Sequence, residues 1–432
     1  MTSRSPLIAV SQEAITRIAT SDAQGGDLKF LHTAIDDVYV VSSVETTNGL
    51  QLPVTDYRSA YAALRRANDT VRGQWLSPVP LEAHVYHNAM AFRPDTMMAL
   101  RAFQELVPYA RDPRSGPYPL ISRLPDLDDE MRAAGIREYA GWNVTKDGVH
   151  PIAIQIQPDE IGVQRLARQW PVAELQTDRV ALIGLGSIGS IVAQALAAYG
   201  IGTIDLIDPD RFLWHNMVRH LLGPESVGRY KVNAIRETLE DRWPETHFVP
   251  HVLDAVHDAH ELRPLLDDSD IVVCAADGIA PRRVVSHLAR RAGIPAVLAC
   301  VLDDGAVGEI LRLRPGPKYG CLLCQRATLQ AQGGIDPEAD QELDYGTGNA
   351  HKPMTAVGPD LWLIGELTAK TSVSTLLEAK HGHGEHRLPG EQAVIALRSA
   401  NDLAAPFDLP DTTSIRWGQV PPPRPDCPTC SP

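Results

Sequence analysis

Short apolar runs alternate with amphipathic stretches over the second half of the chain. The apolar runs are typical of buried strands, and the stretches between them have helical periodicity. The predicted strands are 179–184, 203–207, 270–276 and 295–302, and the predicted helices are 187–199, 232–243, 281–292 and 361–377. Buried strands that alternate with helices predict an α/β fold with a doubly wound, mostly parallel sheet.

The first part of the chain has a less regular pattern. It predicts a strand at 37–44 and helices at 57–68 and 96–107, with proline-rich breaks between them. It contains no catalytic motif and no cysteine. We therefore predict an α+β accessory or recognition domain over residues 1–155, followed by the α/β domain over residues 156–432.

Composition and charge exclude some classes of function. Hydrophobic residues make up 44% of the chain and charged residues 22%, as in globular proteins. The formal net charge of -14 argues against a nucleic-acid partner, because phosphate binding needs clustered Lys and Arg. No apolar run approaches the roughly 18 residues that cross a membrane, and no signal peptide is indicated. We expect a cytoplasmic protein without a membrane partner.

A glycine-rich turn, Gly184-Leu-Gly186-Ser-Ile-Gly189, lies between the first strand and the first helix of the α/β region. Glycines at this spacing allow backbone N–H groups to approach a phosphate, and the following helix adds its positive N-terminal dipole. Asp208 ends the next strand, where a ribose-binding carboxylate is expected. This pattern indicates nucleotide binding and leaves ATP and NAD undecided.

A second group of polar residues follows Asp208. Asn216, Arg219 and Lys231 come after Asp208-Pro-Asp210, in the patterns N-x-x-R and G-x-x-K. Cations and hydrogen-bond donors suit a triphosphate, because attack of a carboxylate on the α-phosphate brings two anions together. An NAD-dependent dehydrogenase has no need for this group, so the pattern favours ATP.

The segment resembles the D-x-D-x-V-x-x-x-N-x-x-R-Q signature and downstream G-x-x-K of the ThiF/MoeB/ubiquitin-activating superfamily. The resemblance implies ATP-dependent adenylation, with Asp208 on the ribose and with Asn216, Arg219 and Lys231 on the phosphates. It also implies that Asp277, at the end of the strand 270–276, holds Mg²⁺. One departure is His220, which stands where the superfamily has Gln.

A shorter match lies upstream, at Arg165-Leu-Ala-Arg168-Gln169, and is similar to the R-Y-x-R-Q segment of that superfamily. There the second arginine reaches across a dimer interface to the partner's ATP, so the resemblance implies this role for Arg168. The chain holds one complete glycine motif, and we therefore expect a homodimer with two sites. The alternative for Arg168 is an ordinary arginine on a helix surface.

Four of the six cysteines form two C-x-x-C pairs, Cys321 with Cys324 and Cys427 with Cys430. Each pair supplies two of the four thiolates that a tetrahedral zinc ion takes. They predict a Zn²⁺ site that staples the C-terminal tail to the α/β domain, and the resemblance implies the same structural role. Redox-active pairs and cysteines without a role are the alternatives. Cys274 and Cys300 lie alone in apolar runs, where buried strand residues are expected.

Together these motifs predict an enzyme that adenylates the C-terminal carboxylate of a ubiquitin-like protein, as the activating enzyme of a conjugation pathway. A conjugating enzyme is then a further partner. The alternatives are adenylation of a sulfur-carrier protein or a peptide, an NAD-dependent dehydrogenase, and a nucleotide-fold scaffold without catalysis.

The loop at 325–358 contains no cysteine, although ubiquitin-type activating enzymes place their acceptor thiol there. A thiolate attacks an acyl adenylate readily, whereas a hydroxyl needs a nearby base. We therefore predict that no thioester forms on this chain and that the adenylate passes directly to an outside nucleophile. The alternative is an oxyester on Thr328, Thr347 or Thr355, with His351 as a base for either of the last two.

Overall fold

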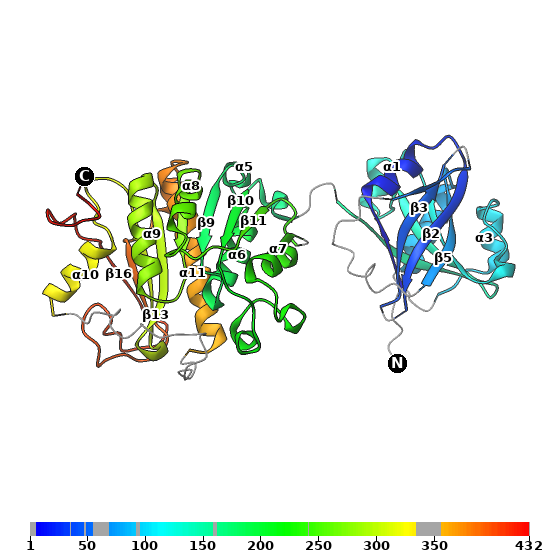
Figure 1. The fold of residues 1–432 in the computed structure, drawn as a ribbon. Coiled ribbons are helices and arrows are strands. Elements are labelled where there is room, and N and C mark those ends of the chain that lie inside the picture. Colours follow the sequence, from blue (N-terminus) through cyan, green and yellow to red (C-terminus); the bar gives the residue numbers. More distant parts are fainter. Residues whose placement is uncertain are drawn as a thin grey trace. The chain divides into compact units, whose positions relative to one another are not determined.

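The computed structural model describes residues 6–34, 36–46, 49–54, 69–91, 96–158, 162–240, 242–333 and 356–431. The chain divides into two compact units, Met1–Ile161 and Gly162–Pro432 (Figure 1). Each unit has its own sheet and its own hydrophobic cores. Among the described residues, no helix is long and apolar enough to cross a membrane.

The second unit is built on a sheet with the strand order β11-β10-β9-β12-β13-β14-β15-β16 in its described part. The five strands from β11 to β13 are parallel, and β14, β15 and β16 continue the sheet antiparallel. The predicted mostly parallel sheet thus carries an antiparallel extension, which is possible because β13 and β14 need only a short turn between them. The strands are β9 (Arg179–Ile183), β10 (Thr203–Ile207), β11 (His247–His251), β12 (Ile271–Cys274), β13 (Ala296–Leu302), β14 (Val307–Leu313), β15 (Gln392–Ala396) and β16 (Ile415–Gly418).

Helices cover both faces of this sheet, as a doubly wound fold requires. Along β9, Val180 and Leu182 face a core shared with α6, α7 and α11, whereas Ala181 and Ile183 face a core shared with α8 and α9. Burial on both faces explains why β9 is a continuous apolar run in the sequence. The helices are α5 (Val172–Leu175), α6 (Ser187–Tyr199), α7 (Lys231–Glu240), α8 (Ala259–Asp267), α9 (Ile279–Ala292), α10 (Leu322–Ala331) and α11 (Gly358–Ala379).

The predicted elements of this unit are found with small shifts at their ends. The predicted helix 187–199 is α6, and the predicted helix 281–292 corresponds to α9. The sequence does not predict β14, because Glu309 and Arg312 interrupt its apolar run. Both side chains are buried in ion pairs, Glu309 with Arg326 and Arg312 with Glu378.

In the first unit, described residues form a sheet with the order β1-β8-β7-β6-β5-β2-β3-β4. β1 also pairs with β3, which closes all the strands except β4 into a ring. The strands are β1 (Leu7–Val10), β2 (Gly25–Thr33), β3 (Val38–Glu45), β4 (Gln51–Pro53), β5 (Asp69–Leu76), β6 (Tyr118–Arg123), β7 (Tyr139–Val144) and β8 (Val149–Ile156). The helices are α1 (Gln12–Thr20), α2 (Leu81–Ala91), α3 (Leu100–Leu106) and α4 (Asp129–Ala133).

The first unit contains more strand structure than the sequence predicts. The predicted strand 37–44 is β3, but the predicted helix 96–107 is shortened to α3. The reason is that Met98 forms an antiparallel bridge with Val149, which holds this part of the chain extended. The predicted helix 57–68 lies outside the described residues.

Candidate active site and cysteine cluster

Three strand ends of the second unit meet at one edge of its sheet. β9 lies between β10 and β12 and is parallel to both. The glycine-rich turn follows β9, Asp208 follows β10 and Asp277 follows β12. In open α/β sheets, ligands bind beside the carboxyl ends of the strands at the point where the chain changes direction across the sheet. The predicted parts of the site therefore share the edge at which such a site is built.

The turn from Gly184 to Gly189 packs closely against the end of β12. Gly184 has a φ of +83°, and a Cβ there would overlap the backbone of Ala276. A Cβ on Gly189 would overlap the carbonyl oxygen of Gly184. Gly186 is the N-cap of α6, and a Cβ there would meet no atom within 4 Å. Two glycines let the turn pack tightly, and the third leaves the amino end of α6 open.

Asp208 supports this turn from the end of β10 and is 5% exposed. Its Oδ2 accepts a hydrogen bond from the Leu185 N–H at 2.6 Å, and its Oδ1 accepts one from the Asp210 N–H at 2.8 Å. Burial raises the pKa of the Asp208 carboxyl, and the charge of Lys231 and the two N–H groups oppose that rise. The carboxylate is therefore held in place by the backbone at considerable cost in desolvation.

Lys231, at the start of α7, is buried beside the two aspartates. Its Nζ lies 3.6 Å from Asp208 Oδ1 and donates a hydrogen bond to Asp210 Oδ2 at 2.8 Å. Burial alone would lower the pKa of Lys231, but the charges of Asp208, Asp210 and Asp277 raise it. The ammonium group is therefore charged at neutral pH.

The short helix η4 (Trp214–Arg219) carries the next two predicted residues. Asn216 Oδ1 accepts a hydrogen bond from the Leu213 N–H at 2.8 Å, so this side chain caps η4. Trp362 of α11 fixes the other end, because its Nε1 donates to the Arg219 carbonyl oxygen at 3.0 Å. The Nε of Arg219 is buried and has no hydrogen-bond partner among the described residues. Such a group costs free energy unless an acceptor binds it.

His220 follows η4 and supports the glycine-rich turn from a second side. It is buried, and its Nε2 lies 2.7 Å from the carbonyl oxygen of Leu185. Its Nδ1 accepts a hydrogen bond from the Leu222 N–H at 3.1 Å. Burial lowers the pKa of His220 to about 4, although the bond to Leu185 opposes that effect. The ring is therefore neutral, with its proton on Nε2.

Asp277 and Arg168 differ in how they relate to this group. Asp277 is exposed on the turn between β12 and α9, and its charge is close enough to raise the pKa of Lys231. Arg168 is exposed between η3 (Gly162–Leu166) and α5. No hydrogen bond or ion pair joins Arg168 to any residue that the structure describes, so within one chain it is not part of this group.

Sequence reasoning missed two supporting residues at this edge. Asp210 was visible as the second acid of D-x-D, but only the fold brings it to Lys231. Trp362 carries no signal in the sequence, because nothing there predicts that α11 packs beside η4. His220 is marked in the sequence only as a departure from the superfamily pattern.

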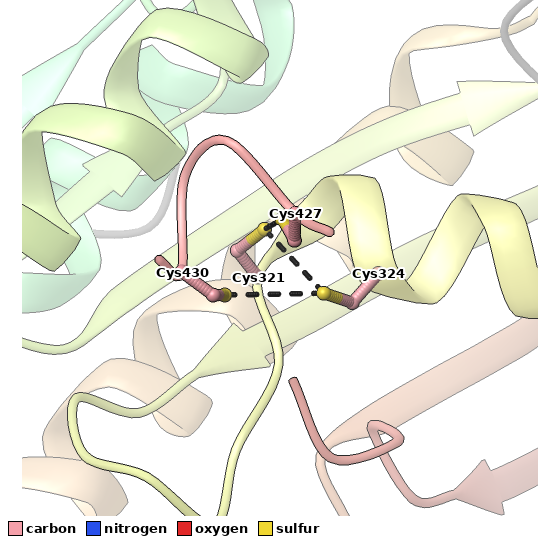
Figure 2. Close-up of side chains that lie close together, drawn as sticks. All are labelled: Cys321, Cys324, Cys427 and Cys430. Atoms are coloured by element: carbon pink, nitrogen blue, oxygen red, sulfur yellow. Dashed lines mark hydrogen bonds between the residues drawn. The ribbon is translucent and has the colours of Figure 1, made fainter. Parts of the chain in front are cut away.

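The four cysteines of the C-x-x-C pairs form one cluster (Figure 2). Cys321 is the N-cap of α10 and Cys324 lies in its first turn, whereas Cys427 and Cys430 lie in the C-terminal tail. The Sγ of Cys321 is 4.0 Å from that of Cys324 and 3.4 Å from that of Cys427. The Sγ atoms of Cys324 and Cys430 are 3.8 Å apart.

The spacing of the four sulfurs is compatible with a tetrahedral metal site. All four sulfurs lie within 4.8 Å of one another, and none is in a disulfide. Zinc–sulfur bonds of about 2.3 Å in a tetrahedron separate the sulfurs by about 3.8 Å. The residues therefore fit a zinc ion, and their convergence into one group favours a metal over two separate redox pairs.

The remaining cysteines are not exposed thiols. Cys274 is fully buried in β12, and burial raises its pKa to about 11. Cys300 is half-buried in β13, with its Sγ 3.9 Å from Glu309 Oε2. Of the candidate hydroxyls, Thr328 lies in α10 and is half-buried. Thr347, Thr355 and His351 lie outside the described residues.

A protein-family model and several known proteins match part of this chain. A model of the ThiF family matches residues 155–401. The molybdopterin-synthase adenylyltransferase of Escherichia coli is 30% identical over 150 residues, which cover 34% of this chain and 59% of that protein. Ubiquitin-like modifier-activating enzyme 5 of Rattus norvegicus is 25% identical over 226 residues, which cover 48% of this chain and 55% of that protein. Uncharacterized protein y4oA of Sinorhizobium fredii is 31% identical over 169 residues, covering 36% of this chain and 28% of that protein.

The chain thus spans between 28% and 59% of the length of these relatives. Among solved structures, Escherichia coli MccB with ATP matches with a TM-score of 0.44 and 22% identity, over 60% of this chain and 68% of that chain. The structure of PaaA matches with a TM-score of 0.44 and 18% identity, over 57% of this chain and 83% of that chain.

Proposed function

This chain belongs to the ThiF family, and from that membership we propose that it is an ATP-dependent adenylyltransferase acting on the C-terminal carboxylate of a ubiquitin-like protein. One observation carries the proposal. The open amino end of α6, the charged Lys231 and the Nε of Arg219, which has no partner among the described residues, belong to segments that meet at the carboxyl edge of one parallel sheet. These are the groups that an anionic nucleotide needs.

Each residue has a role in this proposal. The turn with Gly184, Gly186 and Gly189 leaves the amino end of α6 open, and the backbone N–H groups there donate hydrogen bonds to phosphate oxygens. Asp208 binds the ribose, since each of its oxygens has a second lone pair left after its backbone hydrogen bond. Asn216, Arg219 and Lys231 bind the phosphates, and Asp277 supplies a hard oxygen ligand for Mg²⁺.

The chemistry explains why cations are grouped here. Attack of a carboxylate on the α-phosphate brings two anions together and expels pyrophosphate. Arg219 and Lys231 offset that repulsion, and Mg²⁺ when bound neutralises the charge of the leaving group. Lys231 is suited to this because its pKa is raised and it stays protonated.

The absence of an exposed lone thiol supports transfer without a thioester on this chain. Cys274 is buried with a raised pKa, Cys300 is half-buried, and the other four cysteines form the cluster. We propose that the adenylate passes to an outside nucleophile, with an oxyester on a threonine as the alternative. A gel of enzyme, ATP and substrate, run with and without reductant, checks this. An adduct that reductant removes and that maps to Cys274 or Cys300 contradicts it.

A second copy of the chain completes the proposed site by supplying Arg168, which has no partner among described residues of its own chain. Large apolar side chains beside Arg219 fit an interface, since Trp214 is 69% and Val218 68% exposed. We expect a homodimer by light scattering, and Trp214→Glu to shift it toward monomer. A wild-type monomer with full activity excludes this role for Arg168.

The proposal also covers the class of substrate and the role of the first unit. A sulfur-carrier protein or a peptide is the alternative substrate, and a scaffold without catalysis is the alternative of another class. We propose that residues 1–155 recognise the substrate, a conjugating enzyme or the second copy, and that residues 156–432 adenylate and carry a structural zinc site.

Two measurements test the activity. Titration calorimetry with ATP·Mg²⁺ and with NAD identifies the nucleotide, and we expect binding of ATP alone. ATP–pyrophosphate exchange with a small protein ending in Gly-Gly tests adenylation, and the same protein with an amidated C-terminus is the matched control. Exchange that persists with the amide refutes carboxylate activation. ATP binding without exchange for any carboxylate substrate supports the scaffold.

A further inference from the structure

The peptide groups on both sides of Leu185 are each held by a side chain from another segment. The Leu185 N–H donates to Asp208 Oδ2 at 2.6 Å, and the Leu185 carbonyl oxygen lies 2.7 Å from His220 Nε2. Leu185 itself is fully buried. This residue lies between Gly184 and Gly186, so both hydrogen bonds hold the first part of the glycine-rich turn in place.

The direction of the Leu185 carbonyl decides the direction of the next N–H. The peptide bond from Leu185 to Gly186 is trans, and in a planar trans peptide the C=O and N–H point in opposite directions. With the carbonyl turned toward His220, the Gly186 N–H points away from it. No partner for that N–H is found in the described part of the chain, and a Cβ on Gly186 would meet no atom within 4 Å.

We propose that His220 is a positioning residue of the nucleotide site, which fixes the Leu185–Gly186 peptide so that the Gly186 N–H faces a bound phosphate. The inference rests on the proposed function. His220 does not touch the nucleotide, and it acts through the backbone of the glycine-rich turn.

The neutral imidazole is suited to this task because each nitrogen has one defined partner. Nε2–H donates to Leu185, and Nδ1 accepts from the Leu222 N–H at 3.1 Å. A side-chain amide offers the same donor and acceptor pair. Gln therefore is the conservative replacement, and Ala removes both bonds.

The test is titration of the full chain with ATP·Mg²⁺, for wild type, His220→Gln and His220→Ala. Loss of a hydrogen bond that orients a binding group is expected to weaken ATP binding about tenfold in His220→Ala. His220→Gln should stay within about threefold of wild type, because its amide restores the donor. In pyrophosphate exchange, the His220→Ala effect should appear mainly in KM for ATP, with kcat less changed.

His84→Ala is the matched control, since His84 is also a buried histidine bonded to a carbonyl, that of Arg137 at 2.7 Å, but in the first unit. We expect wild-type ATP affinity in His84→Ala. Equal losses in His84→Ala and His220→Ala, wild-type affinity in His220→Ala, or no rescue by Gln would each overturn the inference. A wild type that binds no ATP overturns the proposed function instead.

Discussion

Two buried aspartates, Asp205 within strand β10 and Asp208 directly after its end, have different environments. Asp205, in the middle of the strand, accepts two hydrogen bonds from Arg179, at 2.7 and 2.9 Å, and lies 2.9 Å from His251 Nε2. Burial alone would raise the pKa of Asp205, but its bonds with His251 and Arg179 lower it. Asp208, at the carboxyl end, has two backbone N–H groups and a more distant Lys231, and its pKa is raised.

The comparison indicates that Asp205 contributes to the stability of the fold, whereas Asp208 contributes to ligand binding. Asp205 is paired on all sides within the chain, so its charge contributes to folding. Asp208 is less fully compensated, and the Nε of Arg219 has no partner in the described part of the chain. Both residues lie at the edge where a ligand would add contacts. Residues that are poorly satisfied without a ligand are those expected of a binding site.

The largest loss of stability is expected from a substitution in the cysteine cluster. Like Asp205, this cluster contributes to the fold and not to ligand binding. Four thiolates in one cluster, three of them on buried cysteines, need a metal as counter-charge, just as Asp205 needs Arg179. We expect about one zinc per chain by elemental analysis, and Cys427→Ser to cost more than about 4 kcal/mol of stability. Zinc-free protein, or full thermal stability of the variant, contradicts this.

Asp205→Ala tests the structural aspartate itself. It leaves Arg179 and His251 without their partner, and breaking such a buried pair costs about 3–5 kcal/mol. Denaturant unfolding measures this loss, and ATP affinity of the folded variant should be unchanged. Asp268 is exposed at the end of α8, and its charge helps to raise the pKa of Arg179. Asp268→Ala is therefore a control for loss of a carboxylate near Arg179, and should change stability little. A stable Asp205→Ala variant that binds ATP poorly would reverse the assignment of the two aspartates.

Arg219→Ala tests whether this arginine contributes to nucleotide binding and catalysis. Loss of one transition-state contact is expected to reduce ATP–pyrophosphate exchange by a factor of about 10²–10³. Because the Arg219 Nε has no partner among described residues, stability should not fall. Arg229→Ala is the matched control, since Arg229 pairs with Glu237 at the surface. Unchanged exchange in Arg219→Ala refutes its role.

The smallest effect is the pH dependence of stability. The folded pKa of Asp205 is lowered, so its stabilisation is present above the unfolded pKa of about 3.9 and is lost as pH falls through the folded value. Asp208 has the opposite sign, because a raised pKa gives a contribution that is present below about pH 3.9 and lost as pH rises through the folded value.

Unfolding free energies of wild type and Asp205→Asn between pH 3 and 7 check this. We expect the advantage of wild type to shrink below about pH 4, with each unit of pKa difference worth about 1.4 kcal/mol. A gap between the two proteins that is independent of pH means that the Asp205 charge contributes nothing.

The local sequence pattern of apolar residues, glycines and polar residues made most of the second unit predictable. The apolar run of β9, the glycines after it and the spacing of Asp208, Asn216 and Arg219 are all readable in one stretch of sequence. β14 was not predictable, because its buried Glu309 and Arg312 look like surface residues until their partners are known. The ring of strands in the first unit was missed for a similar reason, since β1 pairs with β3 and β8 only in the fold.

The sequence by itself determined which residue types surround the candidate site, because glycine turns and strand-end acids are encoded locally. It also determined that four cysteines come in two pairs. The sequence also predicted that the pairs converge, and the structure brings their sulfurs into one cluster. Tertiary structure alone decided that His220 and Asp208 hold opposite sides of Leu185. The physical reason is that a hydrogen bond between distant segments depends on distance in space, which the order of residues does not record.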